Sequence, residues 1–154
     1  MKIVLSIAIL LALLISLSTA VTYSNAGIQG YVDSYNSKID TAPGILKGLV
    51  GNEKINADIT GKDGAVFRVG FVTENGRINQ TVGGGLGDPS IVITTTESAI
   101  NNIRSSGNPI VAFQSERDSG QMNVEAKNLL TGIKLGAVLS SPSVLQFFSN
   151  VFFG

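Results

Sequence analysis

Residues 91–126 read IVITTTESAINNIRSSGNPIVAFQSERDSGQMNVEA. This stretch predicts a strand, two short helices separated by a corner, and a second strand. Its first five residues are Ile-Val-Ile-Thr-Thr, and β-branched side chains favour the pleated surface of a sheet. Thr96 then offers an N-cap hydroxyl, and Glu97 places a negative charge in the first helical turn, where the helix dipole favours it.

A corner at residues 105–109 ends the first helix and begins the second. Pro109 suits the first position of a helix, because its missing N–H would have no intrahelical partner there. Gly120 stands where a helix commonly ends in a left-handed residue. Met122, Val124 and Ala126 then alternate with polar residues, and this period of two predicts the returning strand.

These residues resemble the sterol carrier protein 2 (SCP2) lipid-transfer family, and the resemblance covers roughly residues 45–139. It is carried by the order of the Asp88-Pro89 turn, the strand at 91–95, the helix at 96–104, the Ser-Gly-Asn-Pro corner at 106–109, the helix through Ala112-Phe113, and Gly120. The resemblance implies an α+β fold in which this segment packs on an antiparallel sheet. It also implies an apolar cavity for a fatty acyl chain or a sterol.

Three strands are predicted before this stretch. Residues 54–60 and 65–73 alternate between apolar and polar side chains. Asn75-Gly76 is a strong hairpin signal and predicts a returning strand at 78–82. With the two later strands they predict a five-stranded, largely antiparallel sheet in an α+β domain spanning residues 27–139. Apolar residues at helical spacing predict covering helices at 27–40, 45–50 and 127–139.

Composition excludes several classes of function. The chain has 154 residues, zero net charge, only 14% charged residues, and no Cys, His or Trp. A neutral chain lacks the basic field that nucleic acid binding requires. A Ser-His-Asp triad, a cysteine nucleophile and a disulfide framework are impossible. An enzyme or an all-oxygen cation site would need paired acids, such as Asp58 with Asp63 or Asp88 with Glu97, and loop and cap roles explain these carboxylates more simply. We therefore expect neither an enzyme nor a bound cofactor or metal.

The glycine-rich segment 83–87 is not predicted to bind phosphate. It leads through Asp88-Pro89 into a strand, whereas a phosphate loop leads into a helix whose N-terminus holds the anion. We interpret it as a flexible connection.

The N-terminal segment predicts export. Lys2 precedes an almost uninterrupted apolar run at 3–17, and Ser18-Thr19-Ala20 has the small–x–small form of a signal-peptidase site. Residues 1–20 are either a cleaved signal peptide or a retained hydrophobic helix that anchors the chain in a membrane. Both alternatives place the rest of the chain outside the cytoplasm, because Lys2 is the only positively charged residue before Lys38 and keeps the N-terminus inside.

The C-terminal segment 140–154 predicts an uncharged helix that holds four of the seven Phe residues. Such an apolar surface needs a partner. Three partners are considered: the domain itself, with the helix as a lid; a membrane interface; and another subunit.

The leading hypothesis is a non-catalytic, exported or membrane-tethered domain that binds a fatty acid, an acyl chain or a sterol-like lipid. The alternative is a cell-surface interaction module with a filled core and no ligand. Arg68 and Arg104 are candidate contacts for a charged head group. The resemblance places the wall of the lipid site on the following residues: Phe67, Val69, Phe71, Ile100, Ile103, Ile110, Phe113, Leu130, Ile133, Phe147 and Phe148.

Overall fold

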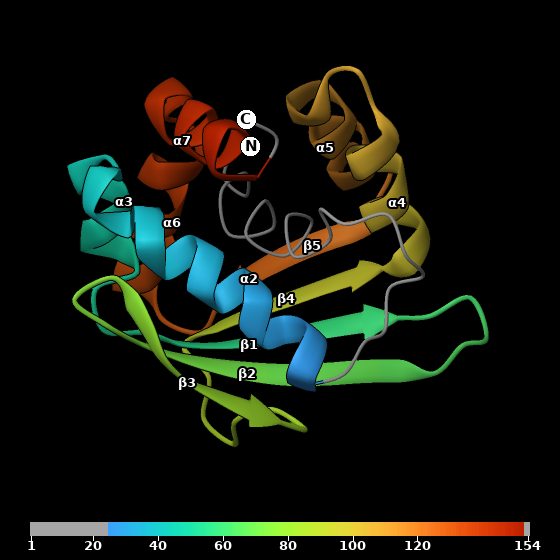
Figure 1. Cartoon of the computed structure of the whole chain (residues 1–154), viewed down its shortest axis with the longest axis horizontal. Coiled ribbons are helices and arrows are strands. Elements are labelled where there is room, and N and C mark those ends of the chain that lie inside the picture. Colours follow the sequence, from blue (N-terminus) through green and yellow to red (C-terminus); the bar gives the residue numbers. More distant parts are fainter. Residues whose placement is uncertain (1–24, 153–154) are drawn as a thin grey trace.

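The computed structural model describes residues 25–152, and Figure 1 shows a sheet with the helices gathered over one of its faces. The sheet has the strand order β3-β2-β1-β4-β5. Its strands are β1 (Lys54–Thr60), β2 (Val66–Glu74), β3 (Arg77–Gly83), β4 (Ile91–Thr96) and β5 (Met122–Ala126). The predicted five strands and the α+β class are confirmed.

The sheet is mixed, because β1 and β4 run parallel while the other neighbouring strands run antiparallel. This parallel pair follows from the connection between β3 and β4. The chain leaves β3 at one edge, passes β2 and β1, and enters the sheet again on the far side of β1. The prediction of a largely antiparallel sheet holds for three of its four strand pairs.

Six α-helices and one 3-10 turn accompany the sheet in the part of the chain that the structure describes. They are α2 (Asn25–Lys38), η1 (Ile39–Thr41), α3 (Gly44–Leu49), α4 (Glu97–Ser105), α5 (Pro109–Asp118), α6 (Leu129–Leu139) and α7 (Pro142–Phe152). Among residues 25–152, no helix combines the length and the apolar character that crossing a membrane requires. The predicted hydrophobic helix at 1–20 lies outside the described residues.

Residues 91–126 fold as the sequence predicts. The Thr96 hydroxyl accepts a 3.1 Å hydrogen bond from the backbone N–H of Ala99 and caps α4. Pro109 begins α5, and the Asn108 side chain caps it by accepting from Val111 N–H. Gly120 has a φ of +76°, a value that glycine adopts without steric cost. Local signals therefore fix the start of both helices and the end of α5.

The glycine-rich connection crosses the face of the sheet opposite to the helices. Asn56 on β1 accepts from Leu86 N–H at 2.7 Å and donates to the Leu86 carbonyl at 2.9 Å. A Cβ atom on Gly70 would lie 2.7 Å from the Leu86 side chain, which is too close for any other residue. The segment interpreted as a flexible connection is thus held against the back of the sheet.

Candidate functional site: an apolar layer between sheet and helices

The helix-facing side chains of four strands line up in three rows. Alternation along each strand sends every second side chain to this face, and the strand register places residues of neighbouring strands side by side. The first row is Phe67, Ile59, Thr95 and Met122; the second is Val69, Ala57, Ile93 and Val124; the third is Phe71, Ile55, Ile91 and Ala126.

The helices close this face with apolar side chains. Ile100 and Ile103 of α4, Phe113 of α5 and Phe147 of α7 join the strand residues in one buried cluster. The helix α2 adds Ile28, Val32 and Tyr35 to the same cluster. Helical spacing predicts that these α2 residues cover the sheet, but the resemblance does not place them in the wall of the lipid site.

Most of the predicted wall residues meet in this cluster. Val69, Phe71, Ile100, Ile103, Phe113 and Phe147 are buried in it, and Phe67 packs against it while partly exposed. Ile110 is half-buried. The side chain of Phe148 lies outside the described part of the chain. That these residues contact a ligand stays a prediction.

Two predicted wall residues lie elsewhere, and this corrects the orientation expected for α6. Leu130 and Ile133 are 65% and 62% exposed, whereas Leu135 and Val138 of the same helix are buried in the cluster. Thr131, Leu135 and Val138 are spaced i, i+4, i+7 and therefore share one face of the helix. Because both faces of α6 carry apolar residues, periodicity could not select the buried one.

A first cleft opens at the β1–β2 turn, at one end of the apolar layer. It has a volume of about 490 Å³, and its apolar floor includes Ile59 and Phe67 from the first row. Its rim includes the charged residues Lys62, Asp63 and Glu97. The cleft therefore lies beside the first row of the layer, where Phe67 is partly exposed.

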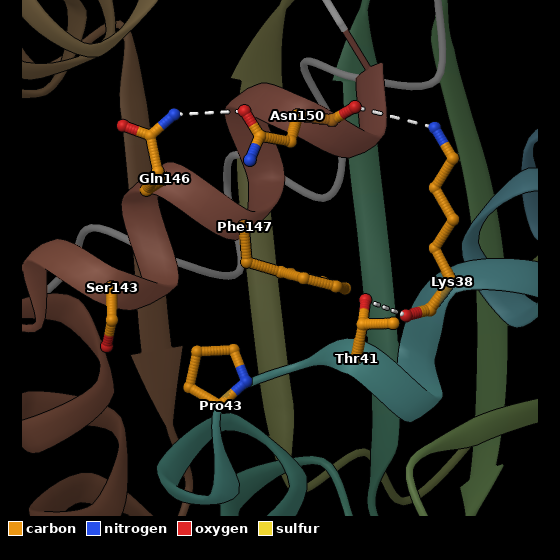
Figure 2. A pocket seen from close by; sticks show the side chains of 7 residues that line it. All are labelled: Lys38, Thr41, Pro43, Ser143, Gln146, Phe147 and Asn150. Carbon is orange, nitrogen blue, oxygen red and sulfur yellow. Dashed lines mark hydrogen bonds between the residues drawn. The ribbon is translucent and has the colours of Figure 1, made fainter.

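A second cleft lies between the end of α2 and the C-terminal helix α7 (Figure 2). It has a volume of about 540 Å³. Phe147 projects into it from α7 toward Thr41, and Lys38 Nζ donates to the backbone carbonyl of Asn150 at 3.4 Å. The full lining is Lys38, Thr41, Pro43, Ser143, Gln146, Phe147 and Asn150.

No family model and no curated protein sequence matches this chain. Solved structures do match it. The SCP2 domain of the ubiquinone synthesis protein UbiJ matches with a TM-score of 0.52 and 11% identity, over 88% of this chain and 98% of that one. The fold is that of sterol carrier protein 2. At 11% identity the match shows the fold alone.

Two further structures support this assignment of an SCP2-like fold. A conserved hypothetical protein of Thermus thermophilus, described as possibly a sterol carrier protein, matches with a TM-score of 0.51 and 12% identity, over 88% of this chain and 93% of its own. A crystal structure of sterol carrier protein 2 matches with a TM-score of 0.50 and 10% identity, over 85% and 96% of the two chains.

One polar side chain interrupts the three strand rows of this SCP2-like domain. Thr95 is only 1% exposed, and its hydroxyl has no hydrogen-bond partner among the described residues. A buried, unpaired hydroxyl costs about 1–3 kcal/mol of stability. Valine has nearly the same shape and would avoid that cost. Sequence reasoning missed this residue, because Thr in a run of β-branched residues is an ordinary strand former.

The two arginines considered as head-group contacts lie outside the layer. Arg68 lies on the face of β2 opposite to the helices, where Nε donates to Asp58 at 2.6 Å. It therefore cannot serve as the head-group contact considered from the sequence. Arg104 lies near Tyr31: burial raises the pKa of that phenol, and the positive charge of Arg104 partly offsets the rise. Arg104 thus borders the layer at the last turn of α4.

Proposed function

We propose that this protein is a non-catalytic domain that holds an apolar ligand, a lipid or a sterol-like molecule, between its sheet and its helices. One observation carries the proposal: six side chains that the family resemblance assigns to a lipid-site wall come from four separate elements and meet in one apolar layer. An apolar site with few polar groups is the usual form of a small-molecule site.

The names of the matched proteins support this proposal by analogy. One is a ubiquinone synthesis protein and another is sterol carrier protein 2. We propose that this chain likewise binds an apolar molecule and, having neither Cys nor His, carries out no reaction on it.

We propose further that α7 is the cover of the site. Val144 and Phe147 of α7 are buried in the apolar layer, and the helix contacts α2, α5 and α6. A helix with this position closes the space above the sheet and must shift for a ligand to pass. The burial of its apolar face favours the lid among the three roles considered for the C-terminal segment.

An extracytoplasmic location is part of the proposal. It rests on the apolar run at 3–17 and on the Ser18-Thr19-Ala20 motif. The test is to express the full chain with a C-terminal tag and to determine the mass of the exported product. A product that begins after residue 20 indicates a signal peptide, and an intact product in the membrane fraction indicates a retained anchor. A chain found only in the cytosol contradicts export.

The test of ligand binding uses the full chain. The purified protein is extracted with organic solvent, and lipid is quantified by mass spectrometry against protein. We expect a fixed molar ratio of lipid to protein. Ile103→Phe fills space inside the layer and should lower that ratio. Val111→Phe adds a similar side chain on the exposed face of α5, where Val111 is 56% exposed, and should leave the ratio unchanged.

Circular dichroism of both variants separates loss of ligand from loss of fold. Equal lipid content in the wild type and both variants would contradict a site inside the layer. A protein that carries no lipid and takes up no fluorescent fatty acid would contradict the proposal and favour the alternative, an interaction module with a filled core.

A further inference from the structure

We propose that the hydroxyl of Thr95 is the hydrogen-bonding anchor of the site, and that the ligand is a neutral molecule with a hydroxyl or carbonyl group, such as a sterol, a fatty alcohol or an ester. This inference rests on the proposed function and narrows the class of ligand.

The position of Thr95 aims its side chain into the layer. Ile91, Ile93 and Thr95 alternate along β4 and are all buried on the helix-facing side. The register sets Thr95 between Ile59 of β1 and Met122 of β5. Its hydroxyl is therefore surrounded by apolar neighbours in its own row.

The three consecutive threonines of β4 have different environments. Thr94 is exposed on the other face of the sheet. The Thr96 hydroxyl accepts the capping hydrogen bond of α4. Thr95 alone is both buried and without a hydrogen-bond partner among the described residues. Buried hydroxyls are nearly always paired, so a partner supplied by a ligand explains why threonine stands here.

The surroundings of Thr95 favour a neutral ligand. The buried polar residues of the described chain are Asn56, Thr73, Thr95 and Thr131, and none of them is charged. A carboxylate beside Thr95 would be buried without a cation, which is far more costly than burying a hydroxyl. Arg104 is eight residues beyond Thr96 along α4, a rise of about 12 Å, and Arg68 is paired on the other face of the sheet. One neutral hydroxyl or carbonyl, in contrast, satisfies Thr95 with a single hydrogen bond.

The first cleft lies beside the row of side chains that contains Thr95. Ile59 and Phe67, which share the first row with Thr95, are part of its floor. The polar group of a ligand bound to Thr95 would lie near the first cleft. The apolar body of the ligand would extend along the second and third rows.

The test measures displacement of the fluorescent sterol dehydroergosterol from the full chain by hexadecanol, palmitate and hexadecane. Palmitate is used at about pH 9, where a carboxylic acid is ionised. The wild type should bind the alcohol more tightly than the acid. Thr95→Val should weaken sterol and hexadecanol by about 3- to 10-fold, the effect of one neutral hydrogen bond, and should leave hexadecane unchanged.

Thr95→Ser keeps the hydroxyl and is the matched control, so it should retain the preference for the alcohol. Thr95→Val should also unfold at a higher temperature than the wild type when both are free of ligand, since it removes the unpaired hydroxyl. Unchanged affinities for sterol and alcohol in Thr95→Val would overturn this inference. So would a preference for palmitate that disappears in Arg104→Gln. Failure of the wild type to bind any of the four molecules would instead overturn the proposed function itself.

Discussion

The phenol of Tyr35 donates a 2.8 Å hydrogen bond to the carbonyl oxygen of Gly76, 41 residues further along the chain. Tyr35 lies on α2, and Gly76 lies in the turn between β2 and β3, where its φ is +82°. Asn36 strengthens the same link, because its side chain bonds both the N–H and the carbonyl of Ile78. These bonds fasten α2 across the edge of the sheet.

Tyr35→Phe should lower the free energy of unfolding by about 1–3 kcal/mol, because it leaves the buried Gly76 carbonyl without its partner. Urea unfolding followed by circular dichroism measures the change. Ser37→Ala is the control: it also deletes a hydroxyl of α2, but an exposed one that bonds only Ser34, and it should cost less than about 0.5 kcal/mol. Equal effects of the two substitutions would contradict a special role for the Tyr35–Gly76 bond.

The stability contributed by Tyr35 should disappear in alkaline solution. Burial raises the pKa of its phenol well above the ordinary value of 10.0. Below pH 10 both the folded and the unfolded chain keep the proton, and the contribution is fully present. Above pH 10 the unfolded chain loses the proton while the folded chain retains it, so stability falls by about 1.4 kcal/mol per pH unit.

Tyr35→Phe has no such proton to lose, so its stability should fall less steeply than that of the wild type above pH 10. Urea unfolding at several pH values between 8 and about 11 measures both slopes. Tyr31 is present in both proteins, and its own titration cancels in the comparison. Parallel curves for the wild type and the variant would contradict the assignment to Tyr35.

Substitutions in α6 should separate its two faces. Leu135→Ala removes a buried side chain and should lower the free energy of unfolding by about 2–5 kcal/mol. Leu130→Ala removes the same atoms from a side chain that is 65% exposed, so it should cost about 0.5 kcal/mol or less. Urea unfolding of the two variants makes the comparison. A larger cost for Leu130→Ala would show that α6 turns the other face inward.

Gly85→Ala should destabilise the connection on the back of the sheet. Gly85 has a φ of +86°, and an added Cβ would lie 2.6 Å from the Arg68 side chain, so both backbone and side chain must adjust. We expect a loss of about 1–3 kcal/mol. Gly87→Ala, where no atom lies within 4 Å of an added Cβ, is the control and should be close to neutral. Thermal unfolding of both variants would show whether they differ.

Local signals predict most of the fold. The alternation at 54–60 and 65–73, the Asn75-Gly76 turn and the caps of α4 and α5 all act between residues close in sequence. For this reason the predicted bounds of every strand agree with the observed ones to within one or two residues. The parallel pairing of β1 with β4 was not predicted, because residues as far apart as Ile55 and Ile91 meet only once the connection has crossed the sheet.

The candidate site was predictable in part. Phe71, Ile103 and Phe113 have the apolar character and spacing of inward-facing residues, and they are buried. Leu130 and Ile133 have the same character, yet they face outward because α6 has two apolar faces. The role of Thr95 could not be predicted from the sequence, because a hydroxyl is left unpaired by the residues around it and not by the type of residue that carries it.

The sequence by itself determined the helices and strands with their caps and turns, because these depend on residue types and short spacings. It also excluded triad, thiol and histidine–metal chemistry, because the chain has no Cys and no His. Only the tertiary structure decided which side chains share the layer between sheet and helices, and which face of α6 packs inward. It also decided that Thr95 is buried with no hydrogen-bond partner among the described residues, while Arg68 lies on the opposite face. Burial and pairing arise between residues far apart in the chain, so no short segment encodes them.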